Sequence, residues 1–85
     1  MEYLFTFQNT HYAIHSEKIL KKGHLPVYVM SLPSKLGDFC GICLRVEPEH
    51  FLEGKSLLEQ QNIPIKKVFT IEQINGERIY KPWKN

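Results

Sequence analysis

The sequence predicts an α+β protein of the ferredoxin-like class, a βαββαβ sandwich with two helices on one face of an antiparallel sheet, plus a C-terminal β-hairpin extension. Short aromatic and β-branched runs alternate with two helical patterns in that order. Asn75-Gly76 is a strong signal for a two-residue hairpin turn. A chain of 85 residues is long enough for one small core but not for two. We therefore expect a single domain over residues 1–85, with a core at 2–71 and a hairpin or tail at 72–85.

The first third of the chain is typical of a buried strand followed by an amphipathic helix. Tyr3–Phe7 is short and rich in aromatic residues. The polar residues that follow it place the N-cap of a helix at Asn9 or Thr10. Over residues 11–22 the apolar side chains gather on one side, as the helical period requires, and Gly23 is well placed to end the helix.

The rest of the chain predicts the remaining strands and a second helix. We expect strands at 27–30, 39–46 and 65–71, a helix from Pro48 to about Gln61, and a short fifth strand at 77–80. Gly54 costs about 1 kcal/mol relative to alanine inside a helix, so we expect close packing on the sheet or a distortion there. Right-handed crossovers place the third strand between strands one and two, which brings Cys40 near the start of the first helix.

Composition and charge exclude several classes of protein. The hydrophobic fraction of 42% and the charged fraction of 24% are ordinary for a folded globular domain. Eleven basic residues against nine acidic ones leave a net charge of +2 without any basic run, so nucleic acid is not an expected partner. No stretch approaches the roughly 18 consecutive apolar residues of a membrane span. Two cysteines are fewer than a secreted domain of this size usually carries, which favours a reducing, cytoplasmic location.

The most informative motif is Cys40-Gly41-Ile42-Cys43, a CxxC at the start of the third expected strand. This spacing serves thiol exchange, half of a metal site, or simple packing of two small apolar side chains. A thiolate at Cys40 would be stabilised by the free N–H groups of the helix that begins near Thr10. Gly41 removes side-chain bulk beside Cys40 and would let a second sulfur approach. No helix follows the motif, which argues against a thioredoxin.

A small zinc site is one alternative. His11 and His15 are four residues apart on one helix face, and with Cys40 and Cys43 they would complete a two-Cys, two-His tetrahedron. Both histidines share their stripe with lysines, which is typical of a solvated face, and no carboxylate stands beside them as a hydrogen-bond partner. We therefore expect no bound metal or other cofactor.

A protein-interaction module with purely structural cysteines is the other alternative. Ile14 points away from the apolar face of its helix, and Ile79, Tyr80 and Trp83 crowd the tail. Packing of the tail on the sheet edge explains these residues better than a docking surface does. The strand at 27–30 has neither a lysine nor an interior proline to discourage edge pairing, which makes a homodimer through a sheet edge an open prediction.

The sequence resembles the small bacterial family of selenium/sulfur carrier-like domains. The resemblance lies in the first strand, in residues of the first helix, in Pro26-Val27, and above all in the Cys-Gly-Ile-Cys-Leu-Arg run at 40–45. It covers nearly the whole chain to about Phe69 and leaves the tail after Ile71 without a match. By this resemblance Cys40 is the matched cysteine, whereas Cys43 stands where the family more often has a small residue such as alanine.

The resemblance implies a carrier of sulfur or selenium rather than a turnover enzyme. Cys40 would accept the atom as a persulfide-type adduct, with Cys43 in a secondary role that releases it as a disulfide forms. Thr10, Gly41 and Arg45 are the expected supporting residues. The partners would be donor and acceptor proteins, with no membrane and no nucleic acid involved.

Overall fold

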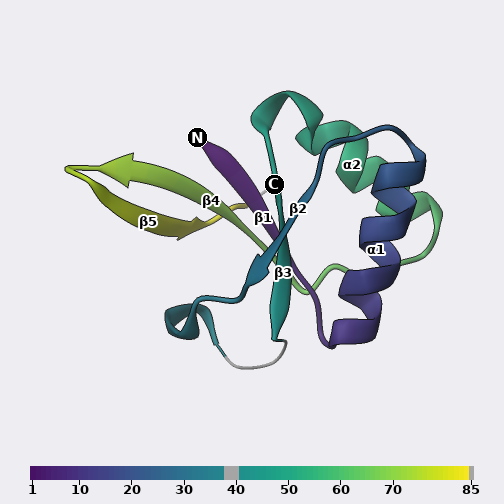
Figure 1. Ribbon diagram of the computed structural model, residues 1–85, viewed down its shortest axis with the longest axis horizontal. Coiled ribbons are helices and arrows are strands. Elements are labelled where there is room, and N and C mark those ends of the chain that lie inside the picture. The colour runs from purple at the N-terminus through teal and green to yellow at the C-terminus, as the bar shows by residue number, and fades with distance from the viewer. Residues whose placement is uncertain (38–40, 85) are drawn as a thin grey trace.

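A computed structural model describes residues 1–37 and 41–84. It contains five strands, two α-helices and a single turn of 3-10 helix: β1 Glu2–Thr6, α1 Thr10–Lys22, β2 Tyr28–Ser31, η1 Ser34–Leu36, β3 Ile42–Val46, α2 Pro48–Gln60, β4 Lys67–Ile74 and β5 Glu77–Pro82 (Figure 1). All pairings between strands are antiparallel, which makes the protein a small α+β structure. Among the described residues, no helix is both long and apolar enough to cross a membrane.

The strands form one sheet in the order β2-β3-β1-β4-β5. As expected, the third strand lies between strands one and two. The expected separate hairpin extension is corrected by the structure, because β4 continues to Ile74 and β5 is a full fifth strand. Residues 69–71 of β4 pair with β1 on one side and with β5 on the other. The turn at Asn75 and Gly76 has φ angles of 52° and 79°, as an Asn-Gly hairpin turn requires.

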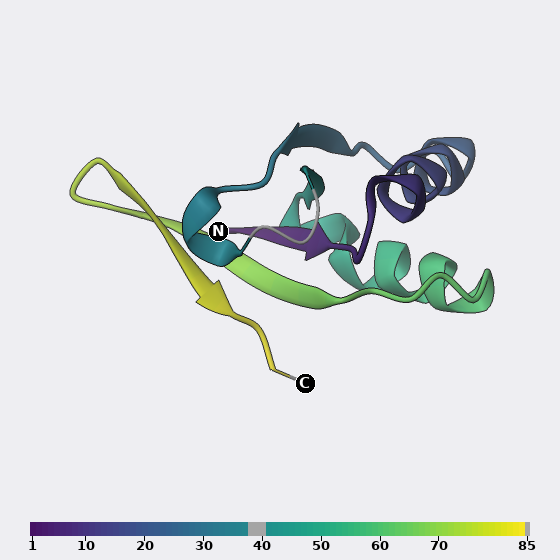
Figure 2. The ribbon, with the colours of Figure 1, turned by 90° about the horizontal axis from the view of Figure 1, so that it is seen from below.

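Side chains on the two faces of the sheet belong to two separate apolar layers, because successive residues of a strand point to opposite faces. Phe5 and Leu44 pack with residues of both helices, so α1 and α2 cover the same face. Figure 2 shows the two helices side by side. The opposite face carries a smaller layer of buried residues, which are Leu4, Cys43, Phe69 and Ile71. Leu32 and Leu36 around η1, with Tyr80 of β5, cover this smaller layer.

The N-terminus of α1 is capped as the sequence predicts. The Asn9 side-chain oxygen accepts a hydrogen bond from the Tyr12 N–H at 3.0 Å. Ala13 and Leu20 are fully buried, so the predicted apolar side of the helix faces the core. Ser16 is also fully buried on this side, and its hydroxyl has no hydrogen-bond partner among the described residues.

Gly23 ends α1 as the sequence predicts, since the helix runs to Lys22 and Gly23 is its C-cap. Its φ of −81° is available to any residue, and the left-handed position is taken by His24, with a φ of 64°. The Leu25 N–H then donates to the Leu20 carbonyl at 3.0 Å. Gly23 instead lies against α2, since a Cβ there would stand 2.9 Å from the Leu57 Cδ1.

Of the two outcomes expected at Gly54, the structure shows no distortion of α2, and the packing there is ordinary rather than unusually close. Gly54 is buried between the helices and the sheet. A Cβ added at this position would lie 3.5 Å from the Leu20 Cδ2 and 3.8 Å from both the Leu25 Cδ1 and the Phe5 Cε2. These are ordinary van der Waals distances, so the space beside Gly54 has room for a methyl group.

The tail packs back on the domain, as the sequence analysis favoured. The Trp83 N–H donates to the Val68 carbonyl at 2.9 Å, which extends the β4–β5 ladder by one residue. The Trp83 ring meets the Phe51 ring edge to face, with centroids 4.9 Å apart. The tail is thus tied to both β4 and α2.

Candidate thiol site

The CxxC motif lies at the connection between β2 and β3. Met30 pairs with Cys43 and Ser31 with Ile42, and the Leu32 N–H donates to the Gly41 carbonyl at 3.2 Å. Cys40, the residue of greatest chemical interest, lies outside the described residues.

Cys43 is buried in the layer opposite the helices. Its side chain is 0% exposed, and its Sγ donates to the carbonyl oxygens of Met30 at 3.6 Å and Ser31 at 3.8 Å. Leu36 and Leu32 belong to the group that covers this layer. Cys43 thus lies inside the sheet layer, as the alternation of side chains along β3 requires. Because the Cys43 side chain has no exposed surface, a partner thiol cannot reach its sulfur in this structure.

The surroundings of Gly41 are open, in contrast to those of Cys43. It is exposed, and a Cβ built on it would have no described atom within 4 Å apart from its neighbours in the chain. Packing therefore does not demand a glycine at this position. The open space agrees with the expectation that a second sulfur could approach beside the motif.

The start of α1 lies at the same end of the molecule as the start of β3 (Figure 1). This follows from the antiparallel register, in which Phe5 near the end of β1 pairs with Leu44 near the start of β3. The first turn of α1 contains no acidic residue. Thr10 is its first residue and is exposed, whereas the cap is formed by Asn9. The positive end of the helix is thus directed toward the end of the sheet where β3 begins.

Arg45 lies on the same face of β3 as Cys43 and ties three strands together. It forms an ion pair with Glu2 of β1, and its guanidinium carbon lies 4.5 Å from the centre of the Tyr28 ring in β2. The Tyr28 hydroxyl in turn contacts a Glu47 carboxylate oxygen at 3.3 Å. These contacts give Arg45 a structural role.

The histidines of the zinc alternative are exposed on α1, with ring centroids 6.3 Å apart. Cys43 faces the other side of the sheet, so the geometry does not bring it to His11 and His15. Within the ranges 1–37 and 41–84, no three potential metal-binding side chains cluster together.

The profile of one protein family, described as "Putative Se/S carrier protein-like", matches residues 2–70. The chain belongs to this family. The match includes the CxxC motif and both helices, and it ends inside β4, close to the limit that the sequence analysis placed near Phe69. No curated protein and no solved structure matches the chain.

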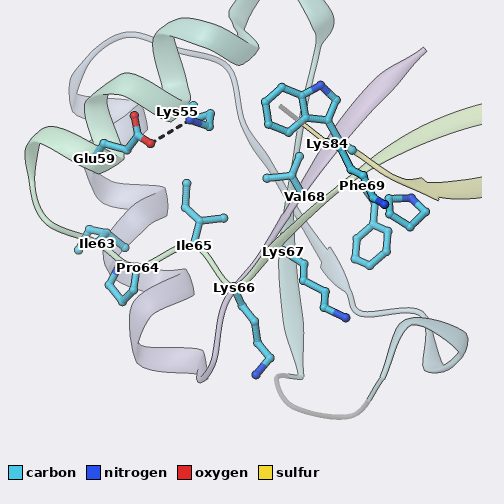
Figure 3. Close-up of a pocket in the computed structure, with 12 residues that line it drawn as sticks. Lys55, Glu59, Ile63, Pro64, Ile65, Lys66, Lys67, Val68, Phe69 and Lys84 are labelled. Carbon is cyan, nitrogen blue, oxygen red and sulfur yellow. Dashed lines mark hydrogen bonds and ion pairs between the residues drawn. The ribbon is translucent and has the colours of Figure 1, made fainter.

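The sequence analysis missed a cleft of about 680 Å³ between the end of α2 and β4. We call it the α2–β4 cleft (Figure 3). It is lined by Lys55, Glu59, Ile63, Pro64, Ile65, Lys66, Lys67, Val68, Phe69, Pro82, Trp83 and Lys84. The adjacent lysines at 66 and 67 were the only local signal, because the other basic side chains come from distant parts of the chain.

Proposed function

We propose that this protein carries sulfur or selenium on Cys40 and delivers it to an acceptor protein. The observation that carries the proposal is the family match over residues 2–70, which contains a CxxC motif whose second thiol is fully buried. Cys40 is then the cysteine assigned to the chemistry. The open space beside Gly41 and the positive end of α1 at the same end of the molecule support this assignment.

The proposed loading step is a thiol exchange that needs no external oxidant. The Cys40 thiolate attacks the outer sulfur of a donor persulfide, the donor S–S bond breaks, and the donor leaves as a thiolate. Cys40 then carries the persulfide. In delivery, an acceptor thiolate attacks the outer sulfur and the Cys40 thiolate leaves. The same exchange applies to selenium in place of the outer sulfur.

Cys43 is assigned to packing rather than to release of the cargo. A releasing role would require its Sγ to attack the inner sulfur at Cys40 and expel hydrosulfide as a Cys40–Cys43 disulfide forms. The thiol instead points into the layer beneath Leu32 and Leu36. The burial of Cys43 therefore supports a carrier in which the acceptor protein, and not Cys43, releases the carried atom.

We also propose a fold class for the first four strands and a cellular location. The order β2-β3-β1-β4, with a helix after β1 and another after β3, supports a ferredoxin-like class for the first four strands. We further propose that residues 1–85 act as one domain in the cytoplasm, where thiols stay reduced.

The proposal is tested by loading the purified protein with a persulfide donor and measuring intact mass. Cys40→Ala is expected to abolish the added sulfur, whereas Cys43→Ala should load to the same extent as the wild type. Zinc content is measured on the same samples. Loading that follows Cys43, or stoichiometric zinc that both variants lose, would overturn the assignment to Cys40.

We also propose that the protein self-associates through β2, because this strand lies at the edge of the sheet and is exposed. β2 is an edge strand of the sheet, and Tyr28 and Val29 on it are 43% and 44% exposed. Pairing of two β2 edges would satisfy backbone groups that otherwise face solvent. Sedimentation at several concentrations should then show a dimer, and a strictly monomeric result would remove this proposal.

A further inference from the structure

We propose that the α2–β4 cleft is a docking groove for an acidic, extended segment of a partner protein. The inference rests on the proposed function in one respect, because the partner would be the donor or the acceptor of the carried atom. Three features of the cleft support it: an apolar floor, a fixed wall and an excess of positive charge on the rim.

The floor of the cleft is mostly aliphatic. Ile63 is buried, and Ile65 and Val68 are partly exposed. Figure 3 shows the side chains of Ile65 and Val68 between Lys55 above and the lysines of the lower rim. The volume of about 680 Å³ lies within the range in which proteins usually bind small ligands or side chains.

One wall of the cleft is fixed by the tail. The Trp83 backbone is tied to Val68, and its ring packs on Phe51. The Lys55 ammonium lies 5.9 Å from the centre of the Trp83 ring, which places a cation on this wall as well. Since these contacts join the tail to α2 and β4, the groove exists before any partner binds.

Among the described residues that line the cleft, the rim carries four lysines and a single carboxylate. That carboxylate, on Glu59, accepts a hydrogen bond from Lys55 at 2.9 Å. Lys67 and Lys84 are exposed and form no ion pair with any residue in the described part of the chain. An acidic partner would supply the missing negative charge.

The lower rim lies at the end of the sheet where β3 begins. Lys67 pairs with Thr6 at the end of β1, and β3 starts at that same end with Ile42. Lys66 and Lys67 extend in one direction (Figure 3). A segment bound along this rim would therefore hold its protein at the end of the sheet that contains Gly41.

A peptide fits this cleft better than a single-stranded nucleic acid does. Proteins bind exposed bases by stacking them on aromatic rings. The floor here is mostly aliphatic, the Phe69 side chain is buried, and Trp83 is partly buried against Phe51. An aliphatic floor suits leucine side chains, and a rim of lysines suits glutamate side chains.

Trp83 is the only tryptophan of the chain, so its fluorescence reports on the cleft directly. We would titrate the full chain with a short peptide of glutamate and leucine residues spaced by glycine, and with the same peptide carrying glutamine for glutamate. The acidic peptide is expected to cause a saturable change that weakens with salt. The neutral peptide should cause none.

Two charge reversals and a matched control test the location. Lys67→Glu and Lys84→Glu are each expected to weaken binding by about five-fold or more. Each change removes a favourable charge from the cleft and adds a negative charge that repels the acidic peptide. Lys18→Glu makes the same change in net charge at an exposed lysine of α1, and should leave the affinity within about two-fold. Equal losses in all three variants, or no saturable signal, would overturn the proposal. An oligodeoxythymidine that binds more tightly than the peptide would assign the cleft to nucleic acid instead.

The two proposals fail separately, because docking does not use the thiol. Cys40→Ala should bind the acidic peptide with unchanged affinity. Intact peptide binding with no persulfide loading in the wild type would remove the carrier function alone. Intact loading without peptide binding would remove the docking groove alone.

Discussion

Cys43 and Met30 face each other across the β2–β3 ladder, and the Cys43 Sγ lies 3.6 Å from the Met30 carbonyl oxygen. The sulfur is therefore held inside the edge of the sheet, beneath the segment around η1. Gly41, two residues earlier, is exposed. The CxxC motif thus passes from an open position to a buried one within a few residues, so its second cysteine is suited to packing.

Removal of the Cys43 side chain should cost stability without preventing folding. Cys43→Ala leaves a small cavity in the layer around Leu4 and Phe69, and we expect the free energy of unfolding to fall by about 1–2 kcal/mol. Urea denaturation measures the change. Cys40→Ala is the comparison, and a larger loss in that variant would mean that the roles of the two cysteines are reversed.

Gly41 should matter for access to the thiol and little for stability. Because a Cβ at this position meets open space, Gly41→Ala is expected to change the free energy of unfolding by less than about 0.5 kcal/mol. It should slow the reaction of Cys40 with a bulky maleimide more than its reaction with iodoacetamide. Equal slowing of the two reagents would show that Gly41 does not govern access.

Gly54→Ala should stabilise the protein. Alanine favours a helix interior by about 1 kcal/mol over glycine, and the added methyl group would make ordinary contacts with Leu20 and Phe5. We expect thermal or urea denaturation to show a gain of about 0.5–1 kcal/mol. Gly23→Ala should give no such gain, because its Cβ would crowd Leu57 at 2.9 Å. A loss in Gly54→Ala would mean that the helices pack more tightly than described.

Ser16→Ala should also stabilise the protein. The Ser16 hydroxyl is buried without a hydrogen-bond partner in the described residues, and loss of such a group relieves a desolvation cost of about 1 kcal/mol or more. Ser56→Ala is the control, since Ser56 is an exposed helical serine that accepts a hydrogen bond from Gln60. If both variants change the free energy of unfolding equally, helix propensity alone explains the effect. The Ser16 hydroxyl would then have a hydrogen-bond partner such as a water molecule.

The local features of the fold were predictable because they depend on neighbouring residues. Asn9 caps α1 by bonding three residues ahead, and Asn75-Gly76 forms its turn within four residues. Gly23 was correctly expected to end α1. The left-handed conformation at that end belongs to His24, while Gly23 leaves space for Leu57 of α2.

The parts that the sequence analysis missed depend on tertiary contacts. The continuous β4 was divided in advance into a core strand and a hairpin, because nothing local shows that residues 69–71 pair on both sides. The α2–β4 cleft unites Lys55, Lys67 and Lys84 from three separate segments. By contrast, the burial of Cys43 followed from alternation along β3, which is a local rule.

The most direct test of sulfur transfer on Cys40 is alkylation of the folded wild-type protein across a pH series, with mass spectrometry that assigns the label to each cysteine. From the proposed position of its thiolate near the positive end of α1, we predict that Cys40 reacts well below the free-thiol pKa of about 8.5. Cys43 should stay unlabelled until the protein is unfolded. Protection of both thiols in the folded protein, or faster labelling of Cys43 than of Cys40, would contradict this prediction.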